Sequence, residues 1–275
     1  MTLVSMADLD RTAAPGGLCA FNVIQLEHAE GIVAGAEAAS RPVVLQVSEN
    51  TTRFHGALAP IASACLALAD QSSAPCTVHL DHATSAELVE QAVGLGVPSV
   101  MFDASVLPHE ENVTATRDIV AYCHGQGVWV EAELGEVGGK DGVHAPGVRT
   151  DPDDAAAYVE ATGVDALAVA VGSSHAMLTR DAVLDNELIA RIAEAVDVPL
   201  VLHGSSGVPD EGLVSAVRQG MRKINIATQL NKQLTAAVRS ALADEAVVDP
   251  RKYLGPGRDA VAAEVERVLH LLARP

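Results

Sequence analysis

The chain has 275 residues, of which 49 % are hydrophobic and 3 % aromatic, and its 36 acidic and 18 basic residues give a formal net charge of −18. A chain of this length buries roughly three quarters of its unfolded surface, and α/β barrels reach this length as one domain, so we expect a single domain over residues 1–275. The charge argues against nucleic acid and anionic membranes as partners. A small phosphate remains possible where backbone N–H groups converge.

The four cysteines are widely spaced and form no Cys-x-x-Cys pair: Cys19, Cys65, Cys76 and Cys123. The N-terminus has no basic start followed by a long apolar run, and no segment reaches membrane-spanning length. We therefore expect a cytoplasmic protein with free thiols, and we do not expect thiolate metal ligands.

Short apolar runs alternate along the chain with longer alanine-rich stretches of helical pattern. The predicted strands, in chain order, are Leu18–Asn22, Val43–Val47, Thr77–Leu80, Ser99–Phe102, Val128–Glu133, Ala166–Val171, Leu200–Leu202 and Lys223–Ile226. The clearest predicted helices are Ser85–Leu95, Asn112–Gln126, Asp151–Thr162, Asn186–Ala195 and Pro209–Gln219. This alternation predicts an α/β fold of the (β/α)₈ TIM-barrel type. An open doubly wound sheet is the alternative, which the lack of a Gly-x-Gly-x-x-Gly turn after the first strand disfavours.

Two segments depart from this alternation. Gly135–Arg149 is long, polar and rich in glycine, as expected of a mobile active-site loop. Asp249–Arg258 contains two prolines and two glycines, and we expect it to precede a last helix at Asp259–Leu272.

Three histidines each lie just past a predicted strand: His82 after the third, His175 after the sixth and His203 after the seventh. A single histidine at such a place is more often an ordinary core or surface residue. In a barrel, however, all three would meet at the carboxyl-terminal mouth, and three protein ligands with one open position make a catalytic zinc site. We therefore predict a metal site.

Candidate phosphate-binding segments follow the last two strands. Gly204–Gly207 (Gly-Ser-Ser-Gly) follows the seventh strand, and Asn225–Thr228 ends the eighth. Barrels often bind phosphate at this corner, because small residues let backbone N–H groups approach its oxygens. Either segment alone could be an ordinary turn.

Acidic residues near the predicted mouth add candidates for proton transfer. Glu131 and Glu133 alternate on the fifth strand, where either could orient an imidazole or be a buried structural acid. Lys140 and Asp141 could transfer a proton if the glycine-rich loop closes, or could form a solvated loop tip. Lys223 on the eighth strand leaves a covalent imine route open.

Nine segments of the chain, in order, resemble the class II, metal-dependent ketose-bisphosphate aldolases. They extend from residue 20 to residue 251: Ala20-Phe-Asn22, Val47-Ser48, His79-Leu-Asp-His82, Ser99-Val-Met-Phe-Asp-Ala-Ser105, Glu131-Ala-Glu-Leu-Gly135, Gly172-Ser-Ser-His175, Leu202-His-Gly-Ser-Ser-Gly207, Lys223-Ile-Asn-Ile-Ala-Thr228 and Asp249-Pro-Arg251.

The resemblance implies reversible cleavage of fructose or tagatose 1,6-bisphosphate to dihydroxyacetone phosphate and glyceraldehyde 3-phosphate through a zinc-stabilised enediolate. It implies that zinc is bound by His82, His175 and His203. Asp81 would be the acid/base at the C4 hydroxyl, and Glu133 would lie beside the metal.

The resemblance also implies two phosphate sites and allows a monovalent cation, Na⁺ or K⁺, nearby. The phosphate of dihydroxyacetone phosphate would be held by Gly204, Ser206, Asn225 and Thr228. The distal phosphate would be contacted by Asn22, Ser48 and Arg251. Arg251 would come either from the same subunit or from a neighbouring one, and we expect a homodimer or homotetramer.

The chain departs from the family pattern at three places. Ala176 replaces the glycine that usually follows the second zinc histidine. Lys140-Asp141 follows two glycines where the family usually has Glu-Glu-Asp, so we assign the enediolate-carbon proton to Asp141. Ala227 stands where the fructose-directed branch often has Asp, which leaves the ketose open.

Three alternatives follow from these departures. One is an aldolase for another phosphorylated ketose. A second is a metal-dependent sugar-phosphate epimerase, which needs acids on both faces of the substrate. The third is a barrel that binds a sugar phosphate without catalysis, and the presence of Asp81 with three histidines argues against it.

Overall fold

The fold is a closed barrel of eight parallel strands, each hydrogen-bonded to the next and β1 to β8. The computed structural model describes residues 4–134, 149–174 and 177–273. The strands are β1 (Leu18–Asn22), β2 (Val43–Ser48), β3 (Cys76–Ala83), β4 (Ser99–Phe102), β5 (Trp129–Glu133), β6 (Ala166–Ala168), β7 (Leu200–Leu202) and β8 (Met221–Ile226). This confirms the predicted (β/α)₈ TIM barrel.

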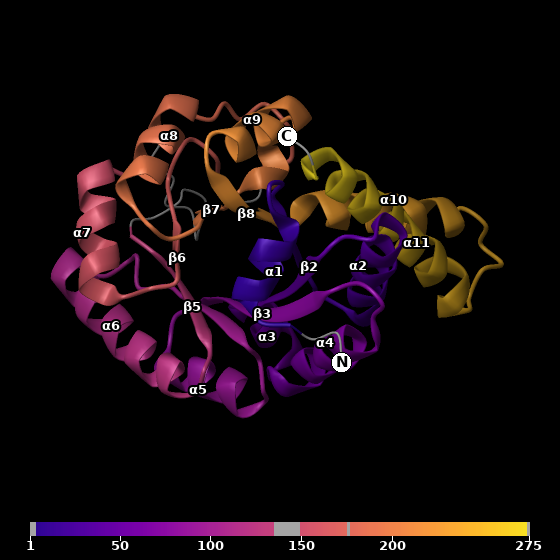
Figure 1. The fold of residues 1–275 in the computed structure, drawn as a ribbon. Helices are drawn as coiled ribbons and strands as arrows, with labels where there is room; N and C mark the ends of the chain where they lie inside the picture. The colour runs from indigo at the N-terminus through magenta and orange to yellow at the C-terminus, as the bar shows by residue number, and fades with distance from the viewer. Residues whose placement is uncertain (1–3, 135–148, 175–176, 274–275) are drawn as a thin grey trace.

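Most helices surround the strands in an outer ring, and α1 (Met6–Ala13) lies across one end of the barrel (Figure 1). The other helices are α2 (Leu26–Ala39), α3 (Glu49–His55), α4 (Ala59–Gln71), α5 (Ala86–Gly94), α6 (His109–Gly125), α7 (Pro152–Thr162), α8 (Asn186–Ala195), α9 (Asp210–Arg218), α10 (Thr228–Ala241) and α11 (Pro250–Leu272), with a short 3₁₀ turn η1 (Ser205–Gly207). The five helices that we predicted most clearly correspond to α5–α9. Among the described residues, no helix is long and apolar enough to span a membrane.

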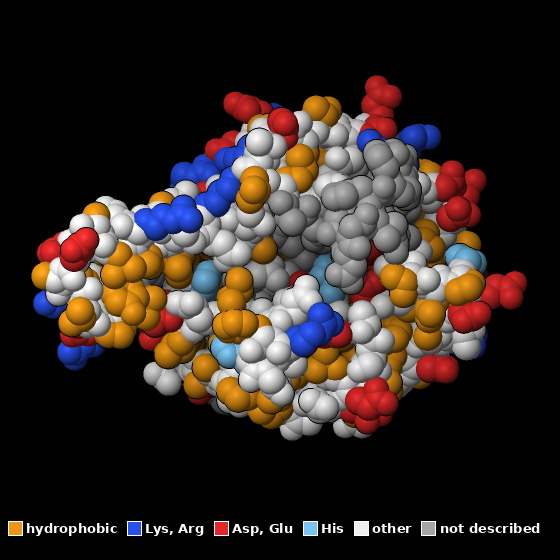
Figure 2. Space-filling view, turned by 180° about the vertical axis from the view of Figure 1, so that it is seen from behind, with side chains coloured by type: hydrophobic (Ala, Val, Ile, Leu, Met, Phe, Trp, Pro, Cys, Tyr) orange, Lys and Arg blue, Asp and Glu red, His pale blue; other side chains and the backbone are white. Residues whose placement is uncertain are grey.

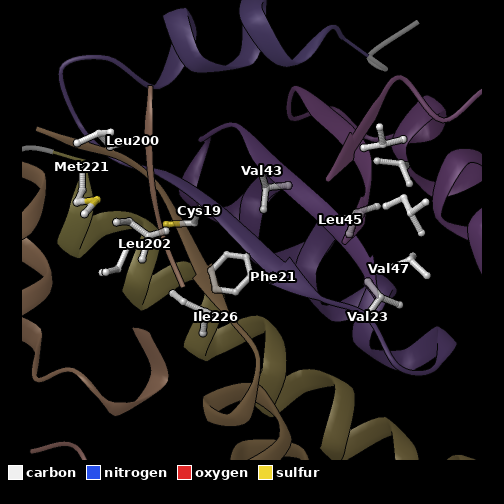
Figure 3. Packing of buried hydrophobic residues seen from close by; sticks show 14 of the residues in the cluster. Cys19, Phe21, Val23, Val43, Leu45, Val47, Leu200, Leu202, Met221 and Ile226 are labelled. Carbon is white, nitrogen blue, oxygen red and sulfur yellow. The ribbon is translucent and has the colours of Figure 1, made fainter. Parts of the chain in front are cut away.

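Alternation along the strands separates an outer apolar layer from the barrel interior. Outward side chains such as Phe21 of β1 and Ile226 of β8, which are register partners, pack in the main core between strands and helices (Figure 3). The inward side chains Leu18 and Ala20 form a separate cluster with α1, which lies across one end of the barrel (Figure 1). This apolar cluster closes one end of the barrel, and the polar residues of the candidate site lie at the opposite end.

Strand β3 is longer than predicted and irregular at its end. It continues through Ala83, and its register with β4 shifts between Leu80 and Ala83. His82 lies inside this irregularity with a φ of +53°, in the left-handed region that non-glycine residues rarely adopt. Strict alternation would turn Asp81 and His82 to opposite faces of the sheet, and the bulge instead lets both reach one cleft.

The prediction that the last helix begins at Asp259 is wrong, because α11 begins at Pro250. Asp249 caps the helix by accepting a hydrogen bond from the Arg251 backbone N–H, and Pro250 occupies the first turn, where its missing N–H costs nothing. A Cβ on Gly257 would lie 3.2 Å from Val238 of α10, so this glycine allows close helix packing.

Two glycines of α2 let α11 pack against it without a gap. A Cβ at Gly31 would lie 2.8 Å from the backbone oxygen of Arg258, and one at Gly35 would lie 2.5 Å from that of Ala262. Backbone cannot move aside as a flexible side chain can, so these positions require glycine for steric reasons.

We expect Gly35→Ala to lower the free energy of unfolding by about 1–3 kcal/mol, the usual cost of overpacking a core. Chemical denaturation monitored by circular dichroism measures it. Gly94→Ala, at the end of α5 where a Cβ meets nothing within 4 Å, is the matched control and should leave stability unchanged or slightly raised. Equal stability of the two variants would contradict the steric argument.

Candidate active site and metal centre

Three strand ends bring ionisable side chains together at the mouth of the barrel. Asp81 and His82 come from the β3 bulge, Glu133 ends β5, and His203 follows β7 directly. The rings of His82 and His203 meet edge to face with centroids 4.7 Å apart. His203 Nδ1 lies 3.2 Å from Glu133 Oε2, and His82 Nε2 lies 3.9 Å from Asp81 Oδ1. The predicted convergence of His82 and His203 is thus observed, whereas His175 lies outside the described residues.

The donor atoms suit a divalent cation. Two overlapping groups, Asp81–His82–His203 and His82–Asp103–Glu133, have ligand atoms within 4.8 Å of one another. Two ligands of a tetrahedral zinc with bonds of ~2.0–2.1 Å lie roughly 3.3–3.4 Å apart, and the His203–Glu133 separation of 3.2 Å is close to that value. Asp81 Oδ1 is buried and has no hydrogen-bond partner among the described residues, as expected of an atom that faces a ligand.

A carboxylate contacts one ring nitrogen of each of the two imidazoles, His82 and His203, and so orients the ring. His82 Nδ1 lies 2.7 Å from Asp103 Oδ2, and Ser105 holds the other oxygen of Asp103 through its Oγ (2.6 Å) and its N–H (3.2 Å). His203 Nε2 lies 3.0 Å from Glu131 Oε1. Such partners fix the tautomer and the ring orientation of metal-binding histidines.

Asp103 is a residue of the candidate site that sequence reasoning missed, although it belongs to a segment that carries the family resemblance. The available signal was its position one residue beyond β4, at the same end of the barrel as the histidines. Glu131 was considered as a residue that orients an imidazole, and its contact with His203 agrees with that interpretation.

Asp81 is a buried carboxylate held in its ionised form. Asn22 donates a hydrogen bond to its Oδ2 through Nδ2 (3.3 Å), and Gln46 Nε2 donates in turn to the side-chain oxygen Oδ1 of Asn22 (3.1 Å). Burial alone would raise the pKa of Asp81. The net shift of the pKa is nevertheless downward, because His82 and His203 when protonated, the Lys223 ammonium and the Asn22 hydrogen bond all favour the charged form. An ionised carboxylate beside a metal site can accept a proton from a substrate hydroxyl.

A cleft of about 380 Å³ opens beside these residues. The face seen in Figure 2 is hollowed at its centre, and histidine side chains are visible there. Eight of the predicted site residues line the cleft: Asn22, Ser48, Asp81, His82, Gly204, Ser206, Asn225 and Thr228. Gln46, Thr51 and Phe54 also line it and were not predicted, because nothing in their local sequence marks them.

The corner after β7 and β8 has the features of an anion site. Gly204 has a φ of +66°, and a Cβ there would lie 2.5 Å from the backbone of Ser174, so the turn requires glycine. Ser206 Oγ accepts hydrogen bonds from the N–H groups of Ala227 and Gln229 (both 3.3 Å) at the start of α10. The Oδ1 atom of Asn225 is buried without a hydrogen-bond partner among the described residues. The N–H groups of Ala227 and Gln229 already donate to Ser206 Oγ, so a phosphate at this helix start would have to use other donors of the corner or displace that hydroxyl.

Two described candidates, Arg251 and Lys223, do not line this cleft. Arg251 is 90 % exposed at the start of α11, paired with Asp249 (2.7 Å). Lys223 lies inside the barrel, 2 % exposed, with its Nζ 2.7 Å from Glu131 Oε2. This buried ion pair argues against the imine route, which needs an accessible amine. Lys140 and Asp141 lie outside the described residues, as does Ala176.

Comparison with known proteins gives one consistent family. The family model "Fructose-bisphosphate aldolase class-II" matches residues 5–274. The chain is 41 % identical over 272 residues to the fructose-bisphosphate aldolase of Geobacillus stearothermophilus (96 % of this chain, 95 % of the relative), and 40 % identical over 274 residues to the probable fructose-bisphosphate aldolase of Bacillus subtilis strain 168 (96 % and 95 %).

Solved structures agree with this assignment. The YdjI aldolase from Escherichia coli K12 superposes with a TM-score of 0.86 at 32 % identity, covering 98 % of this chain and 97 % of the other. A putative fructose-1,6-bisphosphate aldolase from Coccidioides immitis gives 0.87 at 29 % identity, covering 97 % and 95 %. The fold is therefore that of a TIM-barrel aldolase, a lyase. The chain belongs to the class II fructose-bisphosphate aldolase family.

We expect His203→Ala to lose bound metal, because the substitution removes a donor whose partner Glu133 lies only 3.2 Å away. Elemental analysis of dialysed protein measures the metal content. His124→Ala is the matched control, because His124 pairs with Asp165 (2.9 Å) and its side chain is 44 % exposed, away from the cleft. Full metal content in the His203 variant would remove this residue from the metal site.

Proposed function

We propose that this aldolase is zinc-dependent and reversibly cleaves a ketose 1,6-bisphosphate of the fructose or tagatose type to dihydroxyacetone phosphate and glyceraldehyde 3-phosphate. The observation that carries the proposal is the position of Asp81, an ionised buried carboxylate in contact range of His82 and facing the cleft. The zinc ligands in this proposal are His82, His175 and His203, and a Na⁺ or K⁺ ion nearby is part of the same proposal.

Breaking the C3–C4 bond requires a proton to leave the C4 hydroxyl and negative charge to develop on the substrate oxygens near C2 and C3. A bound divalent ion supplies Lewis acidity that stabilises such charge. Asp81 takes the C4 hydroxyl proton as the bond breaks and returns it in the reverse direction. Glu133 Oε2 lies 3.2 Å from His203 Nδ1, so Glu133 would support or replace a ligand of a bound ion. We assign the proton of the enediolate carbon to Asp141.

Substrate orientation follows from the two ends of the cleft. The phosphate of dihydroxyacetone phosphate occupies the corner at Gly204, Ser206, Asn225 and Thr228. The opposite end receives the distal phosphate, with Asn22 and Ser48 on the wall of the cleft. This orientation places the scissile carbons next to Asp81.

Arg251 reaches the distal phosphate only from a neighbouring subunit in this proposal. Its side chain is 90 % exposed and outside its own cleft, and the α10–α11 pair projects beyond the helix ring (Figure 1). Val248 and Leu242, 83 % and 44 % exposed, lie in the chain between the same two helices. Exposed apolar residues beside a cation fit a contact between two copies of the chain, so we propose a homodimer or homotetramer. A cytoplasmic location is part of the same proposal.

The named relatives support fructose bisphosphate as the first substrate to test. Ala227 lines the cleft where the fructose-directed branch often has Asp, so tagatose bisphosphate and other phosphorylated ketoses should be tested beside fructose bisphosphate. A coupled assay for triose phosphate release, with chelator and then with added zinc, tests the activity. Loss with chelator and recovery with zinc supports the proposal, whereas release that is insensitive to chelator contradicts the metal requirement.

We expect Asp81→Ala to lower kcat by about 10²–10⁴-fold, the usual contribution of a general acid/base, with zinc retained. Steady-state assays and elemental analysis of the same preparation measure both quantities. Near-normal turnover would show that another group handles the C4 proton. Loss of zinc together with turnover would make Asp81 a ligand instead.

We expect Arg251→Ala to raise KM for ketose bisphosphates with little change in kcat, because it removes ground-state binding to the far phosphate. Arg239→Ala is the control, because Arg239 lies in the last turn of α10 and has no assigned role in the cleft. An unchanged KM in the Arg251 variant would end the proposed phosphate contact.

A further inference from the structure

A chain of buried polar groups crosses the barrel interior beneath the metal centre. Lys223 Nζ lies 2.7 Å from Glu131 Oε2, and the other oxygen of Glu131 lies 3.0 Å from His203 Nε2. On its opposite side Lys223 Nζ lies 3.5 Å from His79 Nε2, and His79 Nδ1 lies 2.7 Å from Ser99 Oγ. We call these five residues the interior polar chain, and each is at most 2 % exposed.

Donor and acceptor roles in the interior polar chain are determined by Lys223. An ammonium can only donate, so Glu131 Oε2 and His79 Nε2 must accept from it. His79 is therefore neutral with its proton on Nδ1, directed at Ser99. Burial, followed by the nearby Lys223, lowers the pKa of His79 well below its usual value, in agreement with a neutral ring.

The same reasoning settles the tautomer of His203. Glu131 already accepts from Lys223, and as a carboxylate it can only accept from His203 as well. The His203 proton consequently lies on Nε2, and the Nδ1 lone pair points to the side where Glu133 Oε2 lies at 3.2 Å. That is the nitrogen which a metal ion beside His82 and Glu133 needs.

Charge gives the reason why a lysine occupies this position. A carboxylate in the dry interior is strongly unfavourable unless it is paired. Lys223 is the one Lys or Arg that the described residues place within 4.0 Å of Glu131. Its charge holds Glu131 as a fixed, doubly accepting carboxylate. Without it, Glu131 would have only imidazole partners, and its orientation toward His203 would no longer be determined.

We propose that Lys223 is a positioning residue for the metal centre, which acts through Glu131 to fix the ring orientation and tautomer of His203. The inference rests on the proposed metal-dependent function, but it concerns metal binding and not substrate choice. It also gives Lys223 a role that does not require contact with substrate.

The experiment measures the zinc dissociation constant by competition with a chromophoric chelator, together with the visible spectrum of the cobalt-substituted protein. We expect Lys223→Met to weaken zinc binding by about 10–100-fold, as loss of an orienting partner of a metal ligand usually does, and to change the cobalt spectrum. Lys223→Arg keeps the charge and should recover most of the affinity.

Arg222→Met is the matched control, because Arg222 neighbours Lys223 on β8 but pairs with Asp10 of α1 (3.0 Å) outside the interior polar chain. Like Lys223→Met, the Arg222→Met substitution removes an ion pair from β8, but we expect it to leave the zinc affinity unchanged. Wild-type affinity in a folded Lys223→Met variant would overturn the proposal. Equal loss in both variants would do the same, because the effect would then come from strand β8 in general.

A second variant keeps the test decisive if Lys223→Met does not fold. Lys223→Met combined with Glu131→Gln removes both charges and leaves an amide oxygen that can accept from His203 Nε2–H. We expect this double variant to bind zinc more tightly than Glu131→Gln alone, in which the amide N–H₂ opposes the ammonium. Additive losses would overturn the proposed coupling. Wild-type zinc binding without ketose cleavage would refute the proposed function but would leave this inference standing.

Discussion

Burial of carboxylates inside the barrel is the constraint on which the rest of the site depends. Asp81, Glu131 and Glu133 are at most 3 % exposed, and isolated charges in such an interior would destabilise the fold. Asp81 and Glu131 have polar partners from other strands, Asn22 and Lys223 respectively. Glu133 Oε2 instead faces His203 Nδ1 at 3.2 Å, a contact that is not a hydrogen bond. The Lys223–Glu131 pair also places Glu131 3.0 Å from His203 Nε2, so a contact that folding requires is one that the proposed metal site would use.

The two ends of the barrel differ in the side chains that they bury: one is apolar, and the other contains the polar groups of the candidate site. At one end α1 packs on Leu18, Ala20 and Val44 in a buried apolar cluster. At the other end the inward positions carry acids, imidazoles and one lysine, supported by the apolar layer between strands and helices. The rigid apolar layer allows the β3 bulge to keep His82 at a positive φ, a strained conformation that would relax in an isolated strand.

The phosphate corner and the projecting α10–α11 pair depend on the same eighth strand. β8 carries Asn225 and ends at Ile226, and α10 follows two residues later, with the Ala227 and Gln229 N–H groups at its start donating to Ser206. The glycine contacts of α2 with α11 fix where the second helix of the pair leaves the ring. Arg251 is thereby presented to solvent, away from its own cleft. An aldolase that needs a cation at the distal phosphate would complete that end of the site with a second copy.

The sequence by itself determined the barrel, because apolar runs alternating with helical stretches reflect local preferences that the tertiary structure does not override. It also indicated His82, Asp81 and the Gly204–Gly207 turn, since strand ends in a parallel barrel face one mouth. Only the tertiary structure decided that Asp103 orients His82, that Lys223 pairs with Glu131 and that α11 begins at Pro250. These features join residues from different strands or follow from close helix packing. Sequence periodicity reports which face a side chain occupies, but not which distant side chain meets it there.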